Sequence, residues 1–263
     1  MFTNSRIRLF SFFLLLSLNV FAVAKATPQD TCLEQLLASF TSMDRRAILN
    51  YTTKDYQLYN DFLRLGKVPK KWKTRENAVL QIQKLKNAIA KIPPVKKQLY
   101  RFIDLGGQTK KMPGRFPWYK GVVFDFKKID PFLKDFDVGQ IYRDQGFVSA
   151  TLNDVPSGKF QFTSVILKID AHNARSLKGL SNYEQEMEYL LPPDTEFRVK
   201  SIKGKFVEHF GSYGAGDYPD EKEWIKFVHH YRDYFPSVTD QEVITRWKKG
   251  EYVPNLIIEL EEI

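Results

Sequence analysis

The sequence predicts an α+β fold in which helices come first and strands follow. Residues 27–97 carry helical patterns with clear end signals, and residues 98–263 carry short apolar and aromatic runs separated by Gly, Pro, Asn and Asp. Runs of strands that follow runs of helices are typical of α+β domains with antiparallel sheets. No linker divides this part of the chain, so we expect a single domain over residues 27–263.

The N-terminus has the pattern of a secretory signal peptide. Arg6 and Arg8 precede an apolar run over residues 9–18, and small residues that suit cleavage follow at Ala22, Ala24 and Ala26. The run is short for a membrane span, which needs about 20 residues. We therefore expect residues 1–26 to be removed and the protein to be secreted, with no stable membrane span after cleavage. An uncleaved anchor is the alternative.

Three helices are expected before the strands begin. The first covers "DTCLEQLLASF", and the second covers "SMDRRAILNYTTKDYQLYNDFLRLG", with Ser42 and Thr53 as N-caps and Gly66 as the C-terminal stop. The third runs from Thr74 to Lys91 and ends at "IPP". Its apolar residues fall on one stripe: Ala78, Ile82, Leu85 and Ile89.

Short runs with strand character fill the rest of the chain: "QLYRFIDL", "GVVFDF", "GFVSATL", "KFQFTSVILKID", "YEQEMEYLL", "EFRVKSIKG" and "NLIIELEEI". Between Phe206 and Pro254, an aromatic and charged stretch instead predicts one or two helices, inserted before the last strand.

The chain is basic, with a net charge of +9 that falls to +6 when Arg6, Arg8 and Lys25 leave with residues 1–26. The excess is concentrated in residues 67–98, where Glu76 is the only acid. Such a face suits an acidic protein, a phosphate-rich ligand or a membrane surface. A solvated helix face that keeps the protein soluble explains the charge equally well.

Cysteine and histidine give no metal-site pattern. The single Cys32 excludes an internal disulfide, so the core must hold the fold together. The histidines show no ligand spacing with one another or with this cysteine: His172, His209, His229 and His230. We therefore expect no metal.

The stretch "NYEQEMEYLLPP" carries glutamates at alternate positions, Glu184, Glu186 and Glu188. On a strand these side chains would share one face and form its solvated side, with Met187 and its alternate neighbours toward the core. That interpretation explains the alternation fully. Alternatively, two neighbouring carboxylates can divide labour, one ionised and one exchanging a proton, as in glycosidic bond cleavage.

Two further segments carry polar side chains at strand positions. "LYRFIDLGG" places Arg101 before a glycine pair, where its guanidinium could bind a phosphate with two hydrogen bonds. "DQGFVSATL" places Ser149 and Thr151 on the same strand face. A surface ion pair and an ordinary polar strand face are the simpler explanations.

Taken in order, these segments resemble the arginine, serine, glutamate class of ADP-ribosyltransferases, in its bacterial exoenzyme type. The resemblance runs from about residue 40 to the end of the chain, through "LYR", "VGQIYRDQGFVSAT", "YEQEMEYLLPPDTEFRV" and "NLIIELEE". Within "AILNYTTKDYQLYNDFLR", the residues that match the family's second helix are Tyr51, Thr52, Tyr56, Asn60 and Arg64.

The resemblance implies a mixed or antiparallel β-sandwich of two roughly perpendicular sheets, with NAD as co-substrate in the cleft between them. Glu188 takes the place of the glutamate that holds the nicotinamide-ribose hydroxyl. Glu186 takes the place of the glutamate that positions or deprotonates an arginine of the target. Arg101 matches the arginine that binds NAD phosphate, and Ser149 matches the serine that orients the catalytic carboxylate.

Other matched positions follow from the same resemblance. Thr151 is the second hydroxyl of the Ser-x-Thr motif, and Tyr183 occupies the aromatic position of the substrate-recognition turn. Tyr51 and Asn60 fall where the family's second helix lines the nicotinamide end of the site.

These matches predict a secreted mono-ADP-ribosyltransferase, a toxin or effector, that modifies an arginine of a target protein and binds neither metal nor nucleic acid. The basic region over residues 67–98 would be its docking face. One alternative is an NAD glycohydrolase, in which water replaces the acceptor. Others are a non-catalytic secreted binding module on the same fold and a membrane-surface binder.

Overall fold

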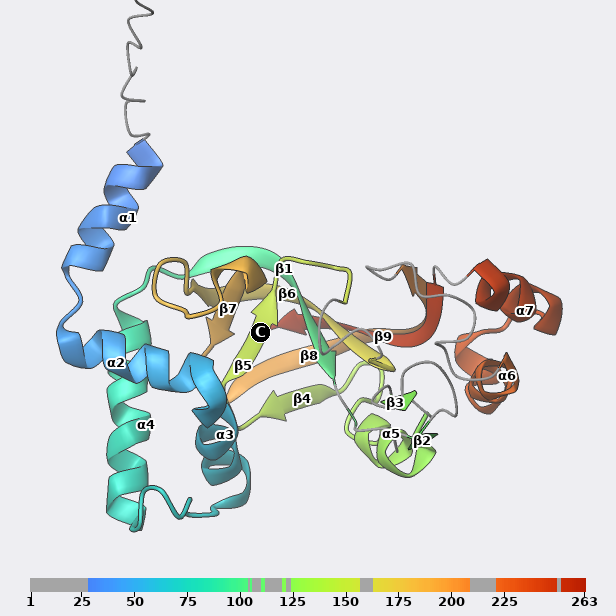
Figure 1. The fold of residues 1–263 in the computed structure, drawn as a ribbon, viewed down its shortest axis with the longest axis horizontal. Coiled ribbons are helices and arrows are strands. Elements are labelled where there is room, and N and C mark those ends of the chain that lie inside the picture. The colour runs from blue at the N-terminus through green and yellow to red at the C-terminus, as the bar shows by residue number, and fades with distance from the viewer. Residues whose placement is uncertain are drawn as a thin grey trace, which may run out of the picture.

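The fold is known from a computed structural model, which describes residues 28–103, 105, 110–111, 120–121, 124–156, 163–208, 221–249 and 252–263. The predicted signal peptide lies outside these residues. Helices come first and a largely antiparallel sheet follows (Figure 1), which confirms the predicted α+β class.

The helices form two groups at opposite ends of the sheet (Figure 1). The first group comprises α1 (Pro28–Ala38), α2 (Ser42–Asn50), the π-helical turn η1 (Tyr51–Asp55), α3 (Tyr56–Leu65) and α4 (Arg75–Ala90). The second comprises α5 (Phe126–Leu133), α6 (Glu221–His230), the 3-10 turn η4 (Arg232–Tyr234) and α7 (Asp240–Lys249). One more 3-10 turn, η3 (Glu184–Glu186), lies between strands.

Seven strands form the main sheet: β1 (Val95–Ile103), β4 (Ile141–Asp144), β5 (Val148–Thr151), β6 (Val165–Ser176), β7 (Glu188–Leu191), β8 (Thr195–Glu208) and β9 (Tyr252–Glu262). A separate ribbon pairs β2 (Lys110–Lys111) with β3 (Lys120–Gly121). Among the described strands, β6 and β9 are the one pair that runs parallel, so the sheet is mixed.

The two sheets expected from the sequence are joined, because β1 and β6 take part in both. On one side, β1 pairs with β5, β5 pairs with β7, and β7 returns to the end of β6. On the other side, β6 continues through β9 and β8 to β4. Because β1 also pairs along its length with β6, hydrogen bonds link all seven strands.

The N-cap of helix α2 lies one residue before the predicted one, and the helix begins at Ser42. The cap is Thr41 rather than Ser42, because the Thr41 hydroxyl accepts from the Asp44 N–H and the Asp44 carboxylate accepts from the Thr41 N–H. This reciprocal pair is a capping box. Helix α4 begins beside the residue expected to start it: Thr74 is its N-cap, and the Thr74 hydroxyl accepts from the Asn77 N–H.

The prediction of Thr53 as an N-cap was wrong. Thr53 lies inside η1, with a non-helical ψ of −135°, and its hydroxyl donates to the Asn50 carbonyl instead of receiving a helix N–H. The chain therefore kinks between α2 and α3 without a capped break. Gly66 ends α3 in the left-handed conformation, with φ of 66°, as predicted.

Some short elements also differ from the sequence prediction. The run "GVVFDF" was expected to be a strand. Its residues 122–123 lie outside the described part of the chain; Gly121 belongs to β3, but Phe126 already begins α5. The strand β4 was not predicted. It has only four residues, two of them exposed, so its apolar pattern is weak.

Two hydrophobic clusters meet at β5 and β7. The larger lies between the sheet and the helices α5, α6 and α7, and the smaller lies among α2, α3 and α4. Phe147 and Leu190 are buried in the helical cluster, whereas their chain neighbours Val148 and Leu191 are buried in the sheet cluster. These two strands therefore stand at the boundary between the clusters.

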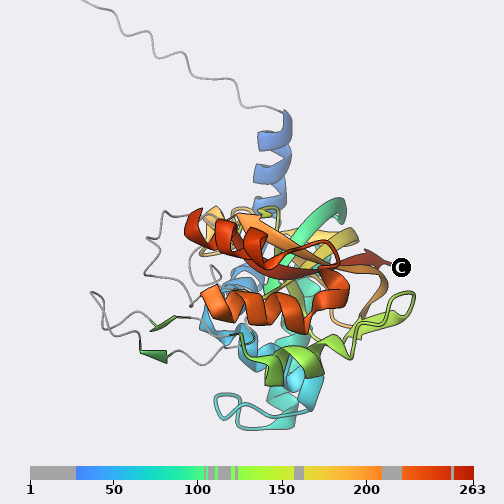
Figure 2. The same ribbon diagram turned by 90° about the vertical axis from the view of Figure 1, so that its right-hand side faces the viewer.

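The segment over residues 206–254 contains α6, η4 and α7, which lie side by side near one end of the sheet (Figure 2). His229 of α6 contacts Asp240 of α7, and Phe235 packs over Gly204 of β8. A side chain at Gly204 would come within 2.4 Å of the Phe235 ring. Glycine at this position therefore allows the aromatic ring to lie directly on the strand.

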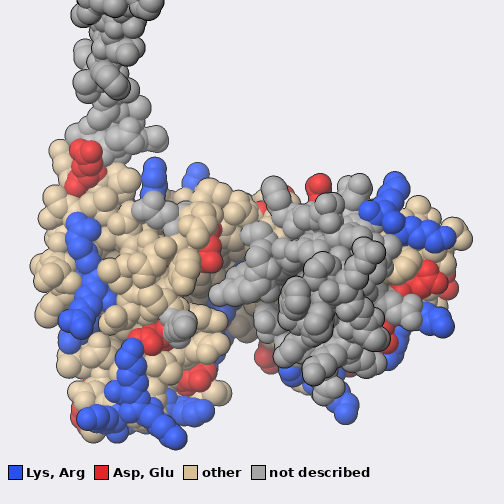
Figure 3. Space-filling model, in the orientation of Figure 1, with Lys and Arg blue, Asp and Glu red and all other residues tan. Residues whose placement is uncertain are grey.

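Lys and Arg side chains gather on the lower part of the N-terminal helical group, around the connection between α3 and α4 (Figure 3). Lys67, Lys70 and Lys73 are exposed there, and Lys71 pairs with Asp55. Among the helices that the structure describes, none has the length and apolarity needed to cross a membrane.

Candidate active site

The candidate site is built on the pairing of β5 with β7. Thr151 lies opposite Glu188, and Ser149 lies opposite Leu190. Residues opposite each other on antiparallel strands point to the same face, so Ser149, Thr151 and Glu188 share one. Val148 and Ala150 of β5 are buried on the other face. The alternation predicted for the Ser-x-Thr strand is therefore present.

Each oxygen of the Glu188 carboxylate accepts a hydroxyl hydrogen bond. The Ser149 Oγ donates to Oε1 at 2.7 Å, and the Ser181 Oγ donates to Oε2 at 3.1 Å. Two hydroxyl donors fix the plane of the carboxylate and stabilise its ionised form. The Ser149 contact was expected from the sequence, and the Ser181 contact was not.

The glutamates of "YEQEMEYLL" do not lie on one strand face. Glu184 to Glu186 form the turn η3, in which the Glu186 N–H donates to the Tyr183 carbonyl at 2.9 Å. Met187 then takes a positive φ of 44°, which a strand cannot accommodate, and β7 begins only at Glu188. The strand prediction was therefore wrong for this segment, and Met187 is 44% exposed rather than in the core.

The turn presents two of the predicted site residues to solvent. Glu186 is exposed, and Tyr183 keeps 40% of its surface accessible. The Thr151 hydroxyl donates to the Glu186 carbonyl at 2.6 Å and accepts from the Asn153 N–H. Thr151 thus ties the backbone of the turn to β5, the strand that also carries Ser149.

Arg101 lies in β1, opposite Leu167 of β6. Its side chain is 21% exposed, and its Nη1 lies 3.9 Å from Oδ2 of Asp144. This nitrogen is buried and has no hydrogen-bond partner within the described part of the chain. A buried donor without a partner is costly, so the position suits an anionic ligand.

Asp144, at the end of β4, is a buried carboxylate that the sequence analysis did not single out. Arg64 of α3 donates to both of its oxygens, at 2.8 and 3.0 Å. The Gly146 N–H and the Tyr142 hydroxyl donate to it as well. A signal was present in the sequence, since an acid two residues before a glycine can accept from the N–H of that glycine in a tight turn.

Tyr51 and Asn60 are both buried, and internal hydrogen bonds occupy their polar atoms. The Asn60 Oδ1 accepts from the Phe147 N–H at 2.8 Å, and its Nδ2 donates to the Tyr51 hydroxyl at 3.4 Å. Asn60 therefore ties α3 to the start of β5. Gly146 makes room for this contact, because a Cβ there would lie 2.7 Å from Asn60 Oδ1.

Burial and two charged side chains of the site shift the pKa of the Tyr51 phenol. Burial raises its pKa far above the usual range, the Arg101 charge opposes that rise, and the Glu188 charge adds to it. The charges of β1 and β7 therefore act on this buried hydroxyl in opposite directions. With its pKa raised in this way, Tyr51 stays a neutral phenol.

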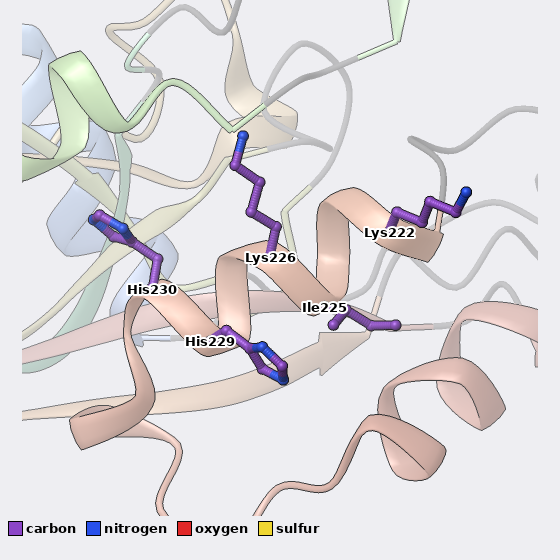
Figure 4. Close-up of a pocket in the computed structure, with 5 residues that line it drawn as sticks. All are labelled: Lys222, Ile225, Lys226, His229 and His230. Atoms are coloured by element: carbon purple, nitrogen blue, oxygen red, sulfur yellow. The ribbon is translucent and has the colours of Figure 1, made fainter.

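The surface hollow along α6 is a separate feature (Figure 4). It is lined by Lys222, Ile225, Lys226, His229 and His230. It belongs to the second helical group, at the far end of the sheet from β5 and β7 (Figure 1). In the described ranges, no group of three or more His, Cys, Asp or Glu could hold a metal ion.

Comparison with known proteins places the chain among bacterial toxins in fold. The toxin Plx2a from Paenibacillus larvae is 18% identical, with 88% of this chain and 90% of Plx2a covered at a TM-score of 0.50. BECa, an ADP-ribosylating toxin of a C. perfringens binary enterotoxin solved with NADH, is 17% identical at a TM-score of 0.55. That match covers 88% of this chain and 45% of BECa.

A curated relative matches a shorter part of the chain. The uncharacterized protein R217 of Acanthamoeba polyphaga mimivirus is 32% identical over 95 residues, which is 34% of this chain and 13% of that protein. This chain therefore corresponds to a small part of that relative.

The family model described as ADP-ribosyltransferase exoenzyme matches residues 28–210, well over half of the chain. The matched range includes Arg101, Ser149, Glu186 and Glu188, the residues that carried the resemblance in the sequence. The chain belongs to the ADP-ribosyltransferase exoenzyme family.

Proposed function

We propose that this protein is a mono-ADP-ribosyltransferase, which moves ADP-ribose from NAD to an arginine side chain of a target protein and releases nicotinamide. The observation that carries the proposal is the Glu188 carboxylate, held by the hydroxyls of Ser149 and Ser181 beside a turn that exposes Glu186. Family membership supports the transfer of ADP-ribose. The presence of Glu186 two residues before Glu188 supports arginine as the acceptor.

In the proposed reaction, Glu188 stabilises positive charge. The bond between the ribose and the nicotinamide nitrogen breaks, its electron pair leaves with nicotinamide, and the ribose becomes cationic. A fixed carboxylate lowers the energy of such a cation, and the stabilisation is strongest where water is excluded. Ser149 and Ser181 are neutral donors, so they orient the carboxylate and leave its negative charge in place.

Glu186 would bind and deprotonate the arginine of the target that accepts ADP-ribose. Its exposed carboxylate can pair with an arginine guanidinium through two hydrogen bonds and remove one proton as the new carbon–nitrogen bond forms. Tyr183, on the same turn and also exposed, would contact the target around that arginine.

Arg101 would hold a phosphate of NAD. Its buried Nη1 has no hydrogen-bond partner within the described chain, and Asp144 lies 3.9 Å away. A phosphate oxygen would supply the missing acceptor in a charge-assisted hydrogen bond.

Nicotinamide release and transfer to poly-arginine test the proposal, in the full-length protein and in single variants. Glu188→Gln keeps the size and removes the charge, and it should lower nicotinamide release by about 100-fold or more. Glu186→Gln should keep release of nicotinamide and lose labelling of poly-arginine. Glu184→Gln, the same change in the same turn, is the control and should behave as the wild type.

Other outcomes would replace the proposal. Free ADP-ribose without labelled acceptor from the wild type would make the protein an NAD glycohydrolase. No nicotinamide release, with cell extract present as a source of acceptors, would favour a non-catalytic binding module.

We also propose that the protein is exported and acts as a toxin or effector, with residues 1–26 as a cleaved signal and residues 27–263 as a single domain. The apolar run and the small residues after it support export through a cleaved signal. N-terminal sequencing of the exported protein should find a start near residue 27, and retention of Met1 would contradict the cleavage.

A further inference from the structure

The hydroxyl of Ser181 lies between Glu188 and the exposed turn that precedes it. We propose that Ser181 is a positioning residue for Glu188, and that it couples this turn, residues 182–187, to the catalytic carboxylate. The inference rests on the proposed function and deepens it, because it names how contact with a target could reach the reacting centre.

The local fold directs Ser181 at Glu188. Leu177 and Leu180 are buried in the helical cluster, and between them Gly179 adopts a positive φ of 73°. The Ser181 N–H donates back to the Leu177 carbonyl at 3.0 Å, which closes this loop. The Leu177 N–H in turn donates to the Glu188 carbonyl at 2.9 Å, so a backbone hydrogen bond also joins this loop to Glu188.

The direction of the Ser181 hydrogen bonds is set by the turn. A serine hydroxyl has one proton to donate, and its lone pairs accept. The Tyr183 N–H donates to the Ser181 Oγ at 3.1 Å, and the Ser181 proton goes to Glu188 Oε2. If Tyr183 moves away, the hydroxyl loses the partner that keeps it oriented, and Glu188 loses an ordered donor.

The turn is held by a hydroxyl at its other end as well. Thr151 donates to the Glu186 carbonyl, from a position directly opposite Glu188 in the sheet. Between the two hydroxyls, Tyr183 and Glu186 are exposed. A target that binds these side chains therefore acts on a segment whose two ends both contact the residues around Glu188.

The chain offers a matched control. Ser176 makes the same kind of local contact as Ser181, because its Oγ accepts from the N–H two residues later, that of Lys178, at 3.4 Å. Ser176 lies at the end of β6, where it is paired with Tyr189. Ser176→Ala thus removes a turn hydroxyl of the same type, whereas Ser181→Ala also removes a donor to the carboxylate.

The test is steady-state nicotinamide release by the full-length Ser181→Ala, Ser181→Thr and Ser176→Ala proteins. A lost hydrogen bond to a charged group should lower kcat by about 10- to 100-fold in Ser181→Ala, with KM for NAD changed by less than about threefold. Ser181→Thr should recover most of kcat, and Ser176→Ala should match the wild type. Equal losses in Ser176→Ala and Ser181→Ala would reduce Ser181 to a turn residue and overturn the proposal.

A second readout does not depend on turnover. The carbon NMR signal of the Glu188 carboxyl, identified by its absence in Glu188→Gln, should move in Ser181→Ala and in Ser149→Ala and stay in place in Ser176→Ala. An unmoved signal in Ser181→Ala would overturn the positioning role. If the wild type released no nicotinamide while this signal moved as expected, the proposed function would fail and the contact would stand.

Discussion

Arg64 and Asp144, separated by 80 residues in the chain, form a two-point ion pair that joins α3 to the end of β4. The Asp144 side chain is 5% exposed and the Arg64 side chain is 34% exposed. Because the turn after Asp144 leads into β5 and Ser149, this pair connects the helical group to the strand that orients Glu188.

Removal of Arg64 should destabilise the protein strongly. Within the described chain, Arg64→Met would leave the buried carboxylate with the Gly146 N–H and the Tyr142 hydroxyl as hydrogen-bond donors and with Arg101 Nη1 3.9 Å away. Breaking a buried pair in this way costs about 3–5 kcal/mol. Asp144→Asn should cost less, since the partly exposed guanidinium can be hydrated. Urea unfolding measures both free energies.

The exposed pair of Lys200 with Glu261 is the control for this measurement. Its side chains are 52% and 34% exposed, so Lys200→Met should cost less than about 1 kcal/mol. Equal costs for Arg64→Met and Lys200→Met would mean that the Arg64 pair contributes no more than a surface contact.

Gly204→Ala should destabilise the packing of the C-terminal helical segment on the sheet. The new methyl group would stand 2.4 Å from atoms of the buried Phe235 ring, and overpacking of this kind costs about 1–3 kcal/mol. Thermal unfolding should show a lower Tm. Phe235→Leu added to Gly204→Ala should regain part of the loss, and a further decrease in the double variant would exclude a clash with this ring as the cause.

Acid stability should depend on Glu259. Its hydrogen bond from Ser201, together with that from Lys168, lowers the pKa of the Glu259 carboxyl from 4.5 to about 2. Between these pH values the unfolded chain binds more protons than the folded one, so stability falls as the pH falls. The contribution is complete above pH 4.5 and is lost toward pH 2.

Unfolding free energies of the wild type and Glu259→Gln, measured from acid to neutral pH, test this linkage. The difference between the two proteins should be constant above pH 4.5 and shrink as the pH falls toward 2. Glu34→Gln, at an exposed position of α1, is the control and should run parallel to the wild type. A constant difference for Glu259→Gln at every pH would contradict the assignment.

The basic connection between α3 and α4 should increase the rate of target modification. Lys70 and Lys73 are exposed there, and electrostatic steering toward an acidic partner raises association rates at low salt. The paired variant Lys70→Glu with Lys73→Glu should lower labelling of proteins in a cell extract by about tenfold at low ionic strength. Nicotinamide release without acceptor should not change.

Lys248→Glu with Lys249→Glu provides a matched charge reversal on α7, at the other end of the molecule. It should leave labelling near the wild-type rate. Unchanged labelling in both paired variants would remove support for docking through α3 and α4. If the Lys70→Glu with Lys73→Glu protein lost binding to vesicles of phosphatidylserine and phosphatidylcholine while its labelling activity stayed unchanged, a membrane surface would be the favoured partner.

The sequence alone predicted that helices precede strands, and it predicted the family. Hydrophobic periodicity and the turn residues predicted helices before strands, since both signals are local. The Ser-x-Thr strand and its contact with Glu188 were also predicted from the resemblance, and the Ser149 Oγ lies 2.7 Å from that carboxylate. Arginine specificity stays a prediction that these motifs make.

Only the tertiary structure decided how the carboxylates are presented. Alternation in "YEQEMEYLL" predicts a strand, but the segment turns at Met187, whose positive φ goes together with hydrogen bonds from Thr151 and Ser181. Asp144 gives no sign in the sequence that it pairs with Arg64. Contacts between residues far apart in the chain depend on how the sheet and the helices pack, and local patterns contain no information about that packing.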